Sequence, residues 1–215
     1  MTTVFIRPAA GATLLAIIGL VLTSCGEVAR TGRGPAFLII DRLEASSGAQ
    51  PDAFGSILFS DVQTLVDTTV NGQTIRVPTV FSDSGRATFR LALKNPGSVT
   101  GPLGPTTLNE ITVTRYRVRF SRADGRNTPG VDVPFGFDGA VTVTVPAGGS
   151  ATVGFDIVRH TNKEEPPLSN MRFSGGANII STIAEVTFYG RDQVGNEVMA
   201  TGNITVNFGD FGDPR

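Results

Sequence analysis

Alternating apolar and polar residues mark much of the second half of the chain. In residues 87–94, Phe89, Leu91 and Leu93 fall on one side and mostly polar residues on the other. The same two-residue period recurs in three further stretches, residues 112–120, 141–145 and 151–157. Such a period is typical of a β-strand with one buried face. We therefore predict a strand in each stretch, with a change of phase near Thr114.

Turn signals predict how several strands connect. Asn71-Gly72 separates two β-forming segments, residues 68–70 and 74–77, and predicts a tight hairpin because both residues accept positive φ. Residues 184–189 and 197–208 predict a final hairpin.

The remaining segments complete an all-β prediction. Short apolar runs predict strands in residues 37–40 and 57–67, and residues 95–110 form a Pro/Gly-rich loop. Residues 161–180 are predicted to be irregular or to contain a short helix. Because no long helix is evident, we expect two antiparallel sheets packed as a β-sandwich.

Composition narrows the function classes. The chain has 215 residues, 26 Gly, 13 Pro, one His, one Cys and no Trp, with a formal net charge of −1. So balanced a charge produces no field that favours nucleic acid. The single cysteine, Cys25, allows no internal disulfide, so we expect the apolar core alone to hold the fold.

The N-terminal segment predicts export. Residues 9–22 are almost wholly apolar, and Arg7 is the only charged side chain before them. This run is shorter than the ~20 residues that cross a bilayer and has the length of a signal-peptide hydrophobic region.

The segment Leu22-Thr23-Ser24-Cys25 resembles the lipidation box of bacterial lipoproteins. That resemblance implies that Cys25 becomes the first mature residue and carries a covalent lipid with fatty acyl chains such as palmitate. Residue 26 is Gly and not Asp, which favours the outer over the inner membrane of the cell envelope. We expect a signal peptide in residues 1–24, a flexible lipidated tether in residues 25–35 and one domain in residues 36–215.

Three turn-bearing segments, residues 91–97, 145–153 and 186–196, resemble bacterial immunoglobulin-like or fibronectin III-like modules. The resemblance implies an immunoglobulin-like antiparallel β-sandwich. Residues 36–83 do not fit the minimal module, and we expect them to add extra N-terminal strands or a hairpin.

A stripe of arginines is the main candidate site. Arg115, Arg117 and Arg119 share one strand face, and Glu185 and Tyr189 join them if the final hairpin pairs alongside. This face could bind a protein or a glycan. It could equally be a solvated outer face with Arg–Glu pairs worth roughly 0.2–1 kcal/mol each.

The sequence contains no recognisable motif for a metal site or for catalysis. Six aspartates are expected in loops, but they lack the Asp-x-Asp-x-Asp spacing of a calcium loop, so we predict no metal site; they are Asp124, Asp132, Asp138, Asp192, Asp210 and Asp213. His160 has no nucleophile motif near it. We predict no cofactor and no enzymatic activity.

These observations predict a lipid-anchored cell-envelope protein with a binding or structural role through protein contacts. Its partners would be the membrane, through the lipid, and an envelope protein. One alternative is a carbohydrate-binding module, although Tyr116 and Tyr189 are the only tyrosines and there is no Trp. The other is an envelope hydrolase that uses a pair of carboxylates.

Overall fold

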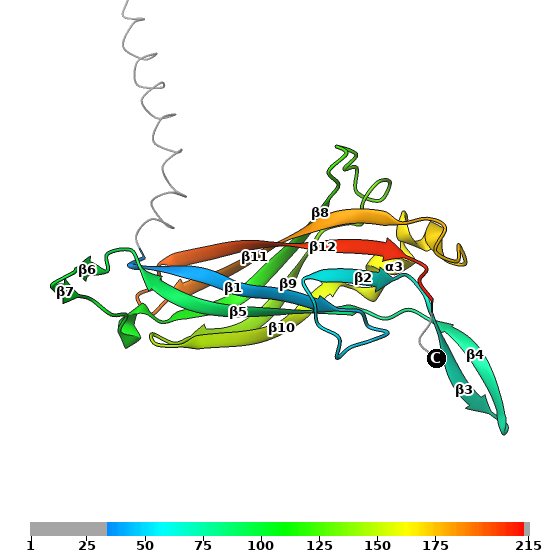
Figure 1. The fold of residues 1–215 in the computed structure, drawn as a ribbon, viewed down its shortest axis with the longest axis horizontal. Helices are drawn as coiled ribbons and strands as arrows, with labels where there is room; N and C mark the ends of the chain where they lie inside the picture. The colour runs from blue at the N-terminus through cyan, green and yellow to red at the C-terminus, as the bar shows by residue number, and fades with distance from the viewer. Residues whose placement is uncertain (1–33, 213–215) are drawn as a thin grey trace, which may run out of the picture.

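A computed structural model describes residues 34–212, which form two packed β-sheets (Figure 1). The predicted signal peptide, Cys25 and most of the predicted tether lie outside the described residues. In spatial order, the larger sheet contains β2 (Ile57–Asp61), β12 (Glu197–Gly209), β11 (Ile180–Asp192), β8 (Ile111–Ser121) and β9 (Phe137–Val145). The smaller sheet contains β1 (Ala36–Ser46), β5 (Asp83–Leu93) and β10 (Ser150–Val158). The all-β prediction is thus confirmed.

Short elements lie outside these sheets. β3 (Thr64–Val70) and β4 (Gln73–Thr79) form a two-stranded hairpin. β6 (Gly97–Ser98) and β7 (Gly101–Pro102) form a second, much shorter one. The helical turns are η1 (Thr107–Asn109), α3 (His160–Glu164) and η2 (Leu168–Met171). The last two fall inside the segment predicted to be irregular or to hold a short helix.

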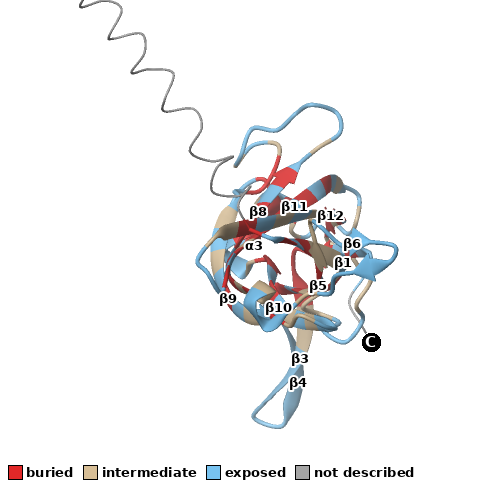
Figure 2. Ribbon diagram, turned by 90° about the vertical axis from the view of Figure 1, so that its left-hand side faces the viewer, coloured by how far each residue is buried: buried red, intermediate tan, exposed pale blue. Residues whose placement is uncertain are grey.

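Aromatic side chains join the two sheets. The Phe89 ring of β5 meets the Phe188 ring of β11 edge-on, with centroids 4.9 Å apart. Phe155 of β10 lies 5.2 Å from the same ring. Burying each such side chain contributes roughly 1.5–3 kcal/mol, and edge-on ring contacts add to it. The buried residues accordingly line the space between the sheets (Figure 2).

The first part of the chain forms both strands and a hairpin, the two structures predicted for residues 36–83. β1 and β2 belong to the two main sheets, and the β3–β4 hairpin projects from them (Figure 1). β2 pairs with β12 in parallel, so the sheet is not purely antiparallel. The reason is that the chain keeps its direction when it crosses from β1 in one sheet to β2 in the other.

The strand pairing defines two ends of the sandwich. Ala36 pairs with Leu93, and Ile111 pairs with both Val145 and Asp192. The loops that follow β5, β9 and β11 therefore lie at the same end of the sandwich. We call this the N-terminal end, because the described chain begins there. The opposite end, where the β3–β4 hairpin projects, is the hairpin end (Figure 1).

Candidate functional site

The predicted arginine stripe lies on the outer surface of the larger sheet. β11 pairs with β8 in a register that sets Glu185 opposite Arg119 and Tyr189 opposite Arg115. Arg117 lies between the two other arginines on β8. We call the surface formed by Arg115, Arg117, Arg119, Glu185 and Tyr189 the arginine face.

A local irregularity in β8 sets the direction of these side chains. The register shifts between Val113 and Arg115 on one side of β8, and between Tyr189 and Gly190 on the other. A bulge of this kind turns the following side chains to the other face. Arg115 therefore points outward while Val113 is buried, which explains the change of phase near Thr114.

Asp138 is the residue of this surface that the sequence analysis missed. It was expected in a loop, but it lies in β9, where its register partner on β8 is Arg117. Arg117 Nε and Nη2 donate to its two carboxylate oxygens, each at 3.0 Å. Arg115 Nη1 approaches the same carboxylate at 3.4 Å. A bidentate pair of this kind fixes the guanidinium plane.

The ion pair shifts the charge equilibria of its members. Hydrogen bonds from Arg117 lower the pKa of the Asp138 carboxyl below its usual value, and the positive charges of Arg117 and Arg115 lower it further. Hydrogen bonding to Asp138 in turn raises the pKa of Arg117. Both groups therefore stay charged across the neutral range.

Tyr189 and Arg115 form a second fixed pair. The Arg115 guanidinium carbon lies 4.1 Å from the Tyr189 ring centroid, which is a cation–π contact. One side of the ring is therefore covered by Arg115. A sugar-binding module needs open aromatic rings on which a sugar can stack, so this contact weakens the carbohydrate interpretation.

Arg119 and Glu185 differ from these pairs. They are register partners on neighbouring strands, yet within residues 34–212 neither side chain makes a hydrogen bond or an ion pair within 4.0 Å. The expected Arg–Glu pairing is therefore replaced by Arg–Asp pairing with β9. Two opposite charges remain side by side, open to other groups.

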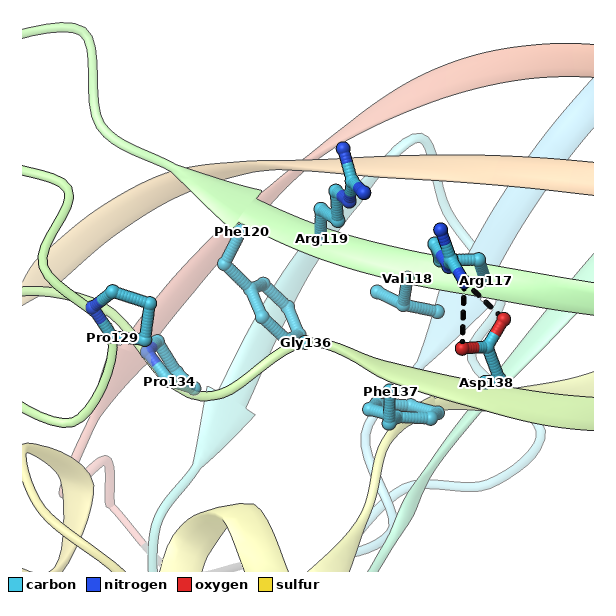
Figure 3. Close-up of a pocket in the computed structure, with 9 residues that line it drawn as sticks. All are labelled: Arg117, Val118, Arg119, Phe120, Pro129, Pro134, Gly136, Phe137 and Asp138. Atoms are coloured by element: carbon cyan, nitrogen blue, oxygen red, sulfur yellow. Dashed lines mark hydrogen bonds and ion pairs between the residues drawn. The ribbon is translucent and has the colours of Figure 1, made fainter.

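Two shallow hollows border the arginine face. One, of about 300 Å³, opens where β9 separates from β8, between Arg117 and Pro134 (Figure 3). In that view Phe120 points into the hollow while Arg119 points away from it. The other, of about 290 Å³, lies beside Arg115, Tyr189 and Met199. Both are small for an enclosed ligand pocket of ~300–1,000 Å³ that buries most of its ligand.

No family model matches the chain. No curated protein matches it either. The function must therefore be argued from the chemistry of its surfaces, because a sandwich fold alone hosts many activities. Within residues 34–212, no helix has the length and apolar character needed to cross a membrane.

The other predicted aspartates within residues 34–212 have structural partners, and Asp213 lies outside the described residues. Asp124 binds both Arg122 and Arg126, and the pairing lowers its pKa. Asp192, expected in a loop, ends β11 and accepts hydrogen bonds from the backbone N–H of Val194 and Asn196. In the described part of the chain, no three His, Cys, Asp or Glu residues are grouped so that they could hold a metal ion.

His160 has a serine neighbour that the sequence did not reveal. Its Nδ1 lies 3.4 Å from Ser82 Oγ, and its backbone N–H donates to the same oxygen at 3.0 Å. Ser82 thus accepts a hydrogen bond at the start of α3. Activating a serine needs a histidine that a third group orients, and no carboxylate between residues 34 and 212 hydrogen-bonds to this ring.

Proposed function

We propose that this chain is a lipid-anchored protein of the cell envelope, held at Cys25, that binds a protein partner and catalyses no reaction. The proposed contact surface is the arginine face. Export and lipidation are supported by the apolar run of residues 9–22 and the Leu22-Thr23-Ser24-Cys25 segment. The outer membrane is the favoured location because Gly26 follows the cysteine.

One observation carries the partner-binding role. Asp138 and Tyr189 hold Arg117 and Arg115 in place, while Arg119 and Glu185 stand open beside them. Preorganised side chains lose little entropy on binding, and arginine and tyrosine are enriched in protein interfaces.

The outer face of the larger sheet, on which the arginine face lies, also has a size that suits a protein partner. Its five strands, about 4.8 Å apart and on average roughly 33 Å long, present about 800 Å². A standard interface buries about 800 Å² on each partner.

The strand order supports an immunoglobulin-like assignment of the domain. β1, β5 and β10 correspond to strands A, B and E of such sandwiches, and β8, β11 and β12 to strands C, F and G. On this assignment, the β3–β4 hairpin is an insertion before strand B.

Photo-crosslinking in intact cells tests the contact surface. A photoreactive residue replaces Arg119, and a matched control replaces Thr152, which is exposed on the other sheet. We expect one protein adduct from position 119 that position 152 does not give and that Arg117→Ala weakens. Equal adducts from both positions, or none from position 119, would contradict the proposal, as would binding on a glycan array.

Fatty-acid labelling tests the anchor. The natural chain is expected to incorporate a labelled fatty acid and to sediment with membranes. Cys25→Ser removes the thiol that would carry the lipid, so it should lose both properties. Label that persists in Cys25→Ser would show that the lipid, if any, is attached elsewhere.

A further inference from the structure

The loops at the N-terminal end of the sandwich carry charge only at Lys94 and Glu110, where the longest of them joins β5 and β8, and are uncharged in their interiors. Strand pairing brings these loops together at that end, because Ile111 pairs with both Val145 and Asp192. No Asp, Glu, Lys or Arg occurs in residues 95–109, 146–149 and 193–196. Loops of a water-soluble protein usually include charged residues, so three loops with uncharged interiors at one end are a feature that needs a physical reason.

The same loops expose aliphatic side chains. Val99 is fully exposed, and the exposed fractions are 60% for Leu103, 67% for Leu108 and 73% for Val194. Single apolar residues scattered over a surface are ordinary. Several exposed apolar residues on neighbouring loops with uncharged interiors indicate a site that contacts a protein or a membrane.

The hairpin end also exposes apolar side chains, such as Phe173 and Ile179, but its longest loop is charged in its interior. Its loop of residues 122–136 carries Arg122, Asp124, Arg126 and Asp132. An apolar residue such as Val131, which is 68% exposed, therefore stands directly beside a charge. The two ends of the sandwich differ in the free-energy cost of leaving water, since charged groups are expensive to desolvate.

The path of the chain ties the N-terminal end to the proposed anchor. A Cβ built on Gly34 would lie 3.6 Å from Asp192 Oδ2, so the described chain begins against the turn that carries Val194. Eight residues, 26–33, separate Cys25 from Gly34, and a fully extended chain over these nine Cα–Cα steps reaches at most about 32 Å. β11 has 13 residues and extends ~43 Å from this end to the hairpin end. The proposed anchor therefore lies nearer to the N-terminal end than to the hairpin end.

We propose that the loops of the N-terminal end rest on the bilayer surface in which the lipid of Cys25 is embedded. This inference depends on the proposed lipid anchor. Val99, Leu103, Leu108 and Val194 enter the interfacial layer, where burying aliphatic surface is favourable. Pro96, Pro102 and Pro105 have no N–H group to desolvate.

This placement orients the whole domain. The hairpin end stands farthest from the membrane, and the arginine face points sideways. A partner bound to the arginine face would therefore lie beside the domain and not beneath it.

Fluorescence in vesicles tests the contact. Val99→Cys is labelled with an environment-sensitive dye in the full lipidated chain, reconstituted in phosphatidylcholine vesicles. Cys25 is blocked by its lipid, so the new thiol is the only reactive one. The matched control is Val131→Cys at the hairpin end.

We expect a blue-shifted emission and quenching by nitroxide-labelled lipid at position 99, and neither effect at position 131. Adding Leu103→Asp and Leu108→Asp should lower the quenching at position 99 at least about tenfold, because each change removes an aliphatic contact and adds a charge. Water-like emission at both positions of a protein whose mass includes the lipid would overturn this inference alone. A mass without lipid would overturn the proposed anchor, and the inference with it.

Discussion

Tyr116 shows how one buried ring determines which residues its neighbours can be. Its side chain is almost fully buried, and its ring lies 5.0 Å from that of Phe155 and 6.2 Å from that of Phe137. Its hydroxyl accepts a hydrogen bond from the backbone N–H of Asp156 at 3.2 Å, and burial raises its pKa. With so many contacts the ring cannot move aside, so a small residue is required where β9 crosses it.

Gly139→Ala tests this requirement. A Cβ at position 139 would overlap the Tyr116 ring, so we expect a loss of about 1–3 kcal/mol in the free energy of unfolding. Gly154→Ala in β10 is the control, because the nearest atom to its Cβ would be 3.9 Å away. Urea unfolding of the two variants measures the difference. Equal stabilities would show that the ring yields.

Asp138 gives a prediction on pH. Its pKa is lowered in the folded protein, so its ion pair stabilises the fold above the ordinary value of about 3.9. That stabilisation disappears as the pH falls through the lowered pKa. NMR titration of the carboxyl should find a midpoint below 3.9 that rises toward 3.9 in Arg117→Ala. An unchanged midpoint would mean that the pair does not form in solution.

At the scale of elements, the β3–β4 hairpin is held to the sandwich at its base. Asp61 at the end of β2 accepts hydrogen bonds from Thr64 Oγ1 at 3.0 Å and from the Phe211 backbone at 3.2 Å. Burial raises the pKa of this carboxyl. Beyond the base both strands are exposed (Figure 2). A two-stranded ribbon of this kind adds little stability to a domain.

Trimming the hairpin tests its independence from the sandwich. Deleting residues 67–70 and 73–76 leaves the Val66–Val77 pair closed by the natural Asn71-Gly72 turn. We expect the free energy of unfolding to change by no more than about 0.5 kcal/mol, because the deleted residues are exposed. Thermal and urea unfolding provide the measurement. A large loss would mean that the outer hairpin contacts the body.

At the scale of the whole molecule, a buried ion pair ties three elements together. Lys163 of α3 donates to Asp83 Oδ1 of β5 at 2.8 Å, and Ser60 of β2 donates to Asp83 Oδ2 at 2.6 Å. The exposed fractions of the Lys163 and Asp83 side chains are 1% and 0%. The network thus connects both sheets and the helix at the hairpin end, without contact with water.

Lys163→Met removes the positive charge and leaves Asp83 buried without a counter-charge. A loss of about 3–5 kcal/mol is expected. Adding Asp83→Asn to Lys163→Met removes the second charge, so it should restore at least half of this loss. Arg191→Ala, which breaks the exposed pair with Glu197, should cost no more than about 1 kcal/mol. Comparable losses in all three variants would contradict this account.

The sequence by itself determined the local features of this protein. Two-residue alternation placed the strands within residues 87–94, 112–120 and 151–157, and Asn71-Gly72 placed a hairpin turn with positive φ at both residues. Each depends on side chains close together along the chain, so the pattern alone contains the information.

Tertiary structure decided which distant residues meet. Arg117 joins Asp138 across a separation of 21 residues, and Lys163 joins Asp83 across 80. Tertiary structure also decided that β2 pairs in parallel with β12 and that the loops with uncharged interiors lie at one end. These features depend on strand order and register, which arise from packing of the whole core, and a charged residue at one position does not encode which partner the fold will set beside it.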